Sequence, residues 1–430
     1  MKINAEYLEG YYNILKYDFQ TGLDKITSNQ FATIRKSEFE SVVNKVVSRK
    51  YTFTRFKKLT LQKGREVNLP TIRDRIILEF LKNRLREKYN LTSPNRNTVI
   101  DSLTKRLQSE VDYFVVRLDI KNFFPSIPQN RLLQKLKANS LLSSQEYNLV
   151  KECLKQSTSG VPQGISISNV LSEIYLEGID YQLKRLNPKI SFYCRYVDDI
   201  LILFNGTFNS SEISRLQTSI SSIFNSYQLD SNLEKQKFIN YKIDKTCEFE
   251  YLGYIFRNDN NKKTIMIEEN KLDKFKNKID FCIWDYKKNQ NFDLLFERIN
   301  YLLLKKVIIK RRRFLSRDSA VNVKAQKIYY GITESYKHVD PSYWLAIDKY
   351  LKQKITSISY LIPQRSQKRR LFSMSLKKNV DRNVILKIYK FDRSEYINRL
   401  IRINSQLLVS SLSNKSLTEL SKLYFSYLKL

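Results

Sequence analysis

The chain has 430 residues, and its 76 Lys and Arg against 43 Asp and Glu give a formal net charge of +33 at pH 7. A hydrophobic fraction of 42% with 13% aromatic residues excludes a disordered chain, because so much apolar surface collapses in water. No apolar run reaches the roughly 18 residues of a membrane span, and the start of the chain lacks the apolar core of a signal peptide. We therefore expect a soluble, cytoplasmic protein with no membrane partner.

The excess of positive charge predicts a polyanionic partner. Like charges in a compact chain repel one another, and binding to the phosphates of a nucleic acid relieves that repulsion and releases counterions. The other interpretation is a basic surface that only keeps the chain soluble. Four dispersed cysteines and a single histidine do not make a His/Cys metal set, so we expect no structural zinc.

Apolar periodicity predicts a helical start, a mixed centre and a helical end. Helix-like spacing covers 37–47, 74–88, 130–136, 271–283, 292–309, 342–358 and 414–428. Strand-like runs cover 113–118, 192–196, 200–204, 250–256 and 264–267. The predicted fold class is therefore α+β. Of the nine glycines, Gly160, Gly164 and Gly253 lie in the mixed centre, where we expect the backbone to turn or to approach another segment closely.

Three carboxylates in the mixed centre predict a metal site. Asp198 and Asp199 lie between two strand-like runs, where a hairpin turn lets both side chains project from its tip. Alone, this pair is also compatible with an ordinary turn. Asp119 ends another strand-like run, and three acids on neighbouring strands can hold two Mg²⁺ ions roughly 3.5–4 Å apart for an in-line phosphoryl displacement. We count Ile120, next to Asp119, in the same metal site, and Mn²⁺ can replace Mg²⁺.

A loop between these acids carries the second motif. Residues 160–164 read Gly-Val-Pro-Gln-Gly and run into an apolar helical segment at 170–179. A bent loop of this kind brings free backbone N–H groups and an amide side chain close to a phosphate or a base. It is the order of Asp119, this loop and the Tyr-Val-Asp-Asp motif at 196–199 that is informative.

In that order the motifs resemble the reverse transcriptases, over about residues 55–260. Further blocks of that family are similar to the segments at 65–75, 99–102, 233–235 and 250–254. The resemblance implies an RNA-directed DNA polymerase, a nucleotidyltransferase that adds dNTPs to a 3′-hydroxyl with two Mg²⁺ ions. It implies a right-hand fold of fingers, palm and thumb, with a ferredoxin-like palm and an α-helical C-terminal extension.

The resemblance also assigns roles to single residues. The catalytic and metal-binding acids would be Asp119, Asp198 and Asp199, with Asp119 and Asp198 as the direct ligands. The nucleotide-binding residues would be Arg73, Phe124, Gln163 and Lys235, and the primer grip would be Leu252 and Gly253. Phe124 stands where the family places the aromatic ring that excludes a 2′-hydroxyl. The alternative for Phe124 is a core residue beside Phe123.

The same resemblance divides the chain into parts. The expected ranges are 1–111 for the fingers with N-terminal helices, 112–128 for the first palm strand, 129–158 for a helical insertion, 159–264 for the palm with the hairpin and primer grip, 265–340 for the thumb, and 341–430 for the helical extension.

The thumb and the extension hold the basic residues expected to bind nucleic acid. These are Lys305, Lys306, Lys310, Arg311, Arg312, Arg313, Arg369 and Arg370. Aromatic residues interleave with basic ones over 301–330, a mixture that suits backbone tracking with base stacking. The alternative for 301–330 is a solvated helix face, and we expect 365–370 to be an exposed RNA-binding loop.

Missing motifs indicate the subgroup. The chain has neither the Asn-Ala-x-x-His element nor the Val-Thr-Gly triplet of retron enzymes, and one histidine does not suit the nuclease of group II intron enzymes. What remains resembles the stand-alone, defence-associated bacterial reverse transcriptases of the unknown and abortive-infection groups. This implies a dedicated noncoding RNA as template, dNTPs as substrates, and a DNA or RNA–DNA product in antiviral defence.

Several alternatives stay open at this point. They are a retron-type enzyme, a template-independent polymerase, a polymerase primed from a protein hydroxyl such as Tyr424 or Tyr427, and a catalytically silent RNA-binding scaffold. The sequence leaves the oligomeric state open.

Overall fold

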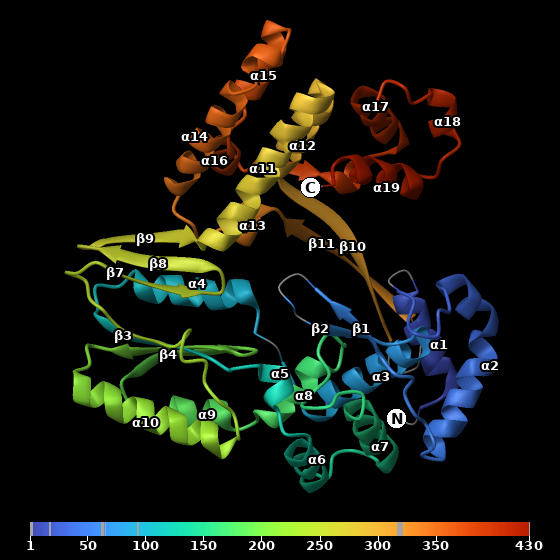
Figure 1. Ribbon diagram of the computed structural model, residues 1–430, viewed down its shortest axis with the longest axis vertical. Helices are drawn as coiled ribbons and strands as arrows, with labels where there is room; N and C mark the ends of the chain where they lie inside the picture. The colour runs from blue at the N-terminus through green and yellow to red at the C-terminus, as the bar shows by residue number, and fades with distance from the viewer. Residues whose placement is uncertain are drawn as a thin grey trace. The chain divides into compact units, whose positions relative to one another are not determined.

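The structure is a computed structural model that describes residues 3–16, 19–61, 64, 66–92, 94–315 and 321–429 (Figure 1). The chain divides into two compact units. The first unit comprises Met1–Ile243 and Arg313–Lys324, and the second comprises Asp244–Arg312 and Ala325–Leu430. No helix in the described ranges combines the length and the apolar character needed to cross a bilayer. Both units contain helices and sheets, so the predicted α+β class is confirmed.

The first unit is built from ten helices in its described residues. They are α1 (Ala5–Leu15), α2 (Ser28–Val47), α3 (Ile72–Lys88), α4 (Arg96–Leu107), α5 (Phe123–Ser126), α6 (Gln129–Ala138), α7 (Ser144–Leu154), α8 (Ser168–Tyr175), α9 (Ile179–Lys184) and α10 (Ser210–Ser226). Capping boxes fix the start of α2 at Thr27 and of α10 at Asn209, where the side chain satisfies backbone N–H groups of the first turn.

A four-stranded antiparallel sheet forms the centre of the first unit. Its strands are β3 (Tyr113–Asp119), β4 (Ile190–Tyr196), β5 (Asp199–Asn205) and β6 (Lys237–Tyr241), in the order β4-β5-β3-β6. The two middle strands read as almost continuous apolar runs, because both of their faces are buried. Helices before β4 and after β5 complete a β-α-β-β-α-β path, which is the ferredoxin-like palm expected from the sequence.

A small hairpin completes the first unit. Its strands are β1 (Lys57–Thr60) and β2 (Glu66–Leu69), which pair antiparallel. They precede α3, whose buried face contributes Ile76, Phe80 and Leu81 to the same core as the central sheet.

The second unit begins with the antiparallel sheet of β7 (Cys247–Tyr251), β8 (Tyr254–Asp259) and β9 (Lys262–Ile267). A second sheet has the order β11-β10-β12, with β10 (Lys305–Leu315), β11 (Val321–Tyr330) and β12 (Ile385–Lys387). The longer helices are α11 (Glu269–Asn289), α12 (Phe292–Leu303), α14 (Tyr343–Thr356), α15 (Arg365–Phe372), α17 (Arg393–Ile403) and α19 (Leu417–Tyr427). Shorter ones are α13 (Ile332–Ser335), α16 (Leu376–Asp381) and α18 (Val409–Ser413).

Two expectations about the second unit were wrong. The helix predicted over 292–309 ends at Leu303, and the rest of that segment belongs to β10, which pairs in parallel with β12. The run Val-Ile-Ile at 307–309 is β-branched and suits a strand once a partner strand is present. The predicted exposed loop at 365–370 is instead the helix α15, because Arg, Lys and Gln are good helix formers and buried Leu371 anchors the helix.

Candidate active site

The three predicted acids meet at one end of the central sheet. Asp119, the last residue of β3, is paired in register with Asp199, the first residue of β5. In an antiparallel pair, opposite Cβ atoms lie only about 5 Å apart. Asp198 precedes Asp199 in the turn from β4 to β5. The backbone therefore places Asp119, Asp198 and Asp199 at the same end of the sheet, and their role as metal ligands stays a prediction.

The turn that carries Asp198 is tight and strained. Tyr196 pairs with Asp199, so the loop consists of two residues, Val197 and Asp198. Val197 has φ +63°, a left-handed conformation that is costly for a β-branched side chain. The amide of Ile120 donates to the carbonyl of Asp198 at 3.3 Å, which ties the turn to the end of β3. This contact uses the backbone N–H of Ile120, the residue that we had counted in the metal site.

The carboxylate of Asp119 is paired with a lysine ammonium. Lys235 Nζ lies 3.1 Å from both carboxylate oxygens of Asp119, and the side-chain amide of Asn232 donates to Oδ2 at 3.3 Å. Asp119 is 7% exposed, so its charge requires such partners. Among the described residues, no three His, Cys, Asp or Glu side chains converge closely enough to hold an ion. The donors are nevertheless carboxylates, the ligands that Mg²⁺ prefers, and the ammonium shows that Asp119 accommodates a cation.

Asp199 has a different partner. The guanidinium of Arg117 donates to both of its carboxylate oxygens, at 3.1 and 3.2 Å. Burial raises the pKa of Asp199, and the neighbouring charges of Asp119 and Asp198 act in the same direction, while Arg117 opposes them. A carboxylate held by a bidentate arginine is oriented by the protein, which suits the expectation that Asp119 and Asp198 are the direct ligands.

The glycine-rich loop packs between Phe124 and β2. Gly160 has φ +58°, and a Cβ atom at this position would lie 2.1 Å from the carbonyl oxygen of Phe124. Gly164 has φ +92°, and its Cβ would lie 2.8 Å from Cβ of Val67. Between them, the carbonyl of Gln163 accepts from both the backbone and the side-chain amide of Asn68, at 2.8 and 2.9 Å. Both glycines are therefore required by close backbone approach, as expected.

Phe124 lies next to this loop in α5. Its ring is half-buried and packs against Phe123 with ring centroids 5.1 Å apart. Its carbonyl accepts from the amide of Val161 at 2.8 Å, so the loop and α5 are joined through the backbone. The packing is compatible both with a ring that faces a nucleotide and with a core residue.

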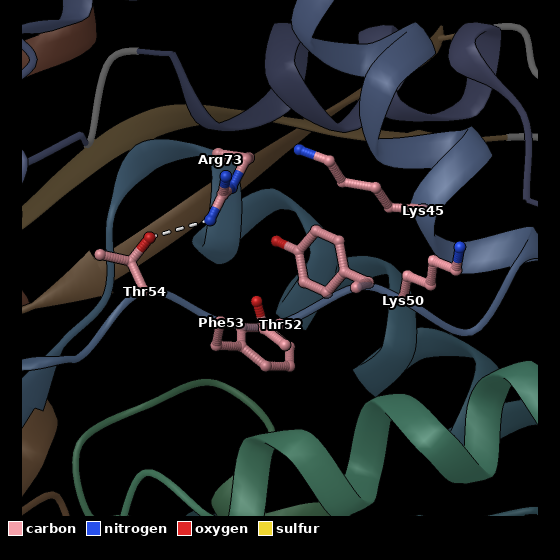
Figure 2. Close-up of a pocket in the computed structure, with 7 residues that line it drawn as sticks. Lys45, Lys50, Thr52, Phe53, Thr54 and Arg73 are labelled. Atoms are coloured by element: carbon pink, nitrogen blue, oxygen red, sulfur yellow. Dashed lines mark hydrogen bonds between the residues drawn. The ribbon is translucent and has the colours of Figure 1, made fainter.

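Arg73 lines a basic pocket of about 160 Å³ in the first unit (Figure 2). The other lining residues are Lys45, Lys50, Tyr51, Thr52, Phe53 and Thr54. The guanidinium of Arg73 donates to Thr54 at 2.8 Å and to buried Asp74 at 3.1 Å, and lies 5.4 Å from the centre of the Tyr51 ring. Arg73 thus has several protein partners, so any nucleotide would have to share it with them.

Leu252 and Gly253 form the tight turn between β7 and β8 in the second unit. Tyr251 pairs with Tyr254, which leaves two loop residues with φ +48° and +81°. Two successive positive φ values are typical of a type I′ hairpin turn. The hairpin is present where the primer grip was expected, and that role stays a prediction.

The basic residues of the second unit differ in exposure. Lys310, Arg369 and Arg370 are exposed, although Arg370 also lies 4.1 Å from the centre of the Phe296 ring. Lys305 is paired with Glu334 at 2.6 Å. Lys306 is only 4% exposed and donates to the carbonyl of Tyr301, which is at odds with direct binding to nucleic acid. The side chains of Arg311, Arg312 and Arg313 lie outside the described part of the chain.

Sequence reasoning missed three residues of this site. Arg117 lies two positions before Asp119, so strand periodicity places both on one face of β3. Asn232 lies three positions before Lys235 and contacts the same carboxylate. No sequence pattern indicated a role for Asn68, because its contact with Gln163 spans 95 positions in the chain.

Comparisons with known proteins agree with the motifs. Residues 56–256 match the family model described as reverse transcriptase (RNA-dependent DNA polymerase). No curated protein matches the chain at a significant level. Similar solved structures include apo telomerase from Candida tropicalis, with TM-score 0.42, 14% identity, 82% of this chain and 61% of that chain covered. Another is telomerase from Candida albicans in complex with a fragment of telomeric RNA, with a TM-score of 0.39 and 13% identity. That match covers 93% of this chain and 69% of the telomerase chain. The chain thus spans about three fifths of the first of these, and at such TM-scores the likeness carries no functional argument.

Proposed function

Residues 56–256 form a reverse transcriptase domain, which indicates a nucleotidyltransferase, and on that premise we propose that the whole chain is an RNA-directed DNA polymerase. The observation that carries the proposal is the placement of Asp119, Asp198 and Asp199 at the same end of the central sheet. A scaffold that only binds RNA does not need three acids at one end of a sheet beside a strained turn.

The proposed cofactor is Mg²⁺, bound as two ions, with Mn²⁺ as a possible substitute. When bound, the metal activates the 3′-hydroxyl and neutralises the leaving pyrophosphate. Asp119 and Asp198 would hold it, while Arg117 keeps Asp199 oriented beside them. Lys235 would leave Asp119 for the negatively charged triphosphate of the incoming nucleotide, because its side chain is 57% exposed and long enough to move.

Other side chains would select and place the substrates. Phe124 would exclude a 2′-hydroxyl and so favour dNTPs, and Gln163 would contact the base pair, held in place through its carbonyl by Asn68. Arg73 would add positive charge near the triphosphate. Leu252 and Gly253 would contact the primer end.

The proposed biological role is narrower. We infer that the template is a dedicated noncoding RNA and that the enzyme acts in bacterial antiviral defence, as in the stand-alone enzymes that the chain resembles. The net charge of +33 supports a stably bound RNA. Priming from Tyr424 is disfavoured, because this residue is 1% exposed and its hydroxyl donates to Glu297 at 2.9 Å. Tyr427 accepts from Asn404 at 2.9 Å and is only half-buried.

The test is dNTP incorporation by the purified protein in Mg²⁺ without added template, before and after RNase treatment. Incorporation that RNase abolishes, and that Asp198→Ala/Asp199→Ala lacks, would identify a bound RNA as template. Asp244→Asn, an exposed acid away from the three carboxylates in sequence, serves as the matched control and should behave as wild type. RNase-insensitive synthesis would instead indicate untemplated or protein-primed polymerisation.

A further inference from the structure

Two large aromatic side chains lie on the solvent side of α11, where an amphipathic helix usually carries polar residues. The buried side of this helix contributes Phe275, Ile279 and Tyr286 to the core. Phe281 and Trp284 are 40% and 56% exposed. Single exposed apolar residues are ordinary, but these two form a pair, with ring centroids 5.8 Å apart and an interplanar angle of 32°.

The pair is held in place by cations. The guanidinium of Arg298, from α12, lies 5.4 Å from the centre of the Phe281 ring. Arg298 is itself fixed, because it donates to Asp285 at 2.7 Å and to the carbonyl of Tyr427 at 2.9 Å. Lys288 Nζ lies 5.6 Å from the centre of the Trp284 ring. The fixed guanidinium of Arg298 therefore restricts the Phe281 ring before a ligand stacks on it.

The surroundings of the pair are basic. With 3.6 residues per turn, Lys274, Lys278 and Lys288 follow the same stripe of α11 as the two rings. These three lysines are exposed, and within the described residues no ion pair engages them. Three acids of α11 have other partners, since Asp280 pairs with Lys354 at 2.8 Å, Asp285 with Arg298 at 2.7 Å and Asp273 with Lys276 at 3.9 Å. The stripe therefore presents aromatic faces flanked by uncompensated positive charge.

We propose that the α11 face formed by Lys274, Lys278, Phe281, Trp284 and Lys288 binds unpaired nucleotides of RNA. Bases would stack on the two rings, and phosphates would follow the lysines. A second copy of the chain is disfavoured as occupant, since it would bring lysines against lysines at a net charge of +33 each. The choice of RNA rests on the proposed function, because a polymerase that copies RNA keeps its DNA product paired, and the unpaired strand is then the RNA.

The experiment uses Trp284 as its own reporter. The chain has two tryptophans, and the other, Trp344, is 2% exposed. In the full chain carrying Trp344→Phe, all tryptophan fluorescence comes from Trp284. Titration with an unstructured oligouridylate of about 15 nucleotides should quench this fluorescence in a saturable way, because a stacked base contacts the indole. Absence of quenching while the oligonucleotide binds by anisotropy would overturn the proposal.

Two matched variants test whether the affinity for oligouridylate depends on Trp284. Trp284→Ala should weaken oligouridylate binding by about tenfold or more, as expected for the loss of a stacking platform. Tyr360→Ala, which removes another exposed aromatic of the second unit, should leave affinity unchanged. Equal effects of both variants would contradict a specific face. Quenching that appears without RNA as protein concentration rises would indicate a second copy instead and would also overturn the proposal.

Crosslinking tests whether the ligand of the α11 face is RNA or DNA. An active-site variant tests whether this binding is independent of the proposed polymerase activity. Ultraviolet crosslinking of the protein isolated with its own nucleic acid should place a ribonucleotide on the peptide that contains Trp284, read by mass. A deoxyribonucleotide there, or no adduct on that peptide, would refute the choice of RNA. Asp198→Asn should lose dNTP incorporation but keep Trp284 quenching, so failure of one activity does not imply failure of the other.

Discussion

At the scale of single residues, the neighbours of each acid distinguish their tasks. Asp119 faces Lys235, whose ammonium is exposed and movable, whereas Asp199 faces the more enclosed guanidinium of Arg117. The ammonium of Lys235 can thus leave Asp119, whereas the guanidinium of Arg117 stays on Asp199 and keeps this carboxylate oriented. The acids are alike in sequence, and only their partners tell them apart.

This difference predicts the behaviour of Lys235→Met. Removing the ammonium relieves the competition for Asp119, so the Mg²⁺ concentration needed for half-maximal incorporation should fall. The KM for dNTP should rise by about tenfold, because the triphosphate loses a cation. Steady-state incorporation measured over a range of Mg²⁺ and dNTP concentrations reads both effects. An unchanged Mg²⁺ requirement would show that Lys235 does not occupy the metal position.

A second prediction at this scale concerns Gly160. An alanine here meets the Phe124 carbonyl at 2.1 Å and also adopts a positive φ, so Gly160→Ala should lose incorporation and at least about 2 kcal/mol of stability. Gly206→Ala is the matched control, since Gly206 has φ +85° but nothing within 4 Å of the added Cβ. It should cost only about 1 kcal/mol and keep activity. Denaturant unfolding and incorporation compare the two, and similar losses would contradict the close approach.

At the scale of elements, β10 contains a buried lysine whose titration affects folding. Burial lowers the pKa of Lys306 to about 8, and the charge of Lys278 acts in the same direction. The unfolded chain, with an ordinary lysine pKa of about 10.4, binds more protons between these values. Stability should therefore rise with pH from about 8 towards 10, by at most a few kcal/mol.

Lys306→Met isolates this effect. The variant should be more stable than wild type at pH 7, and the difference should shrink as pH rises to about 9.5. Chemical denaturation at several pH values measures it, with Lys310→Met as the exposed control that should show no such trend. A constant difference across this pH range would mean that Lys306 keeps its ordinary pKa in the folded protein.

The carboxylate of Glu297 joins three helices of the second unit. It accepts from Arg399 and from the hydroxyl of Tyr424, both at 2.9 Å, and is 4% exposed, so α12, α17 and α19 meet at one buried charge. Glu297→Ala should cost about 2–3 kcal/mol, because Tyr424 and Arg399 both lose a buried acceptor, although Arg399 keeps its contact with Glu395 at 2.6 Å. Tyr424→Phe removes only one hydrogen bond and should cost about 1 kcal/mol. Thermal unfolding of both variants tests this, and equal costs would mean that the charge is not the critical group.

Elements also show how far the sequence alone could reach. The strands around the acids were predicted correctly because the short apolar runs, the hairpin at 196–199 and the family motifs all agree. The β10–β11 pair was missed, since Val307 to Ile309 form an apolar run that fits a helix or a strand, and its pairing with β12 lies about 80 positions away in the chain. Likewise, only strand periodicity could have placed Arg117 beside Asp119, and only the folded loop shows that Asn68 contacts Gln163.

At the scale of the whole molecule, the net charge and the three acids have separate parts in the proposed function, which are nucleic-acid binding and catalysis. A net charge of +33 attracts a nucleic acid in any orientation, while in the proposed function the three acids and the loop at 160–164 would define where chemistry occurs. Binding should therefore survive the loss of any one acid, and incorporation should not. The α11 face adds a specific contact to this general attraction.

Primer extension on a supplied RNA template tests the central claim most directly. With a DNA primer annealed to RNA, four dNTPs and Mg²⁺, wild-type protein should extend the primer to the end of the template. Asp198→Asn should bind the same duplex with similar affinity and extend it at least about 100-fold more slowly. If wild-type protein binds the duplex and adds no nucleotide, or if Asp198→Asn extends it at the wild-type rate, the assignment of these acids to polymerisation is wrong.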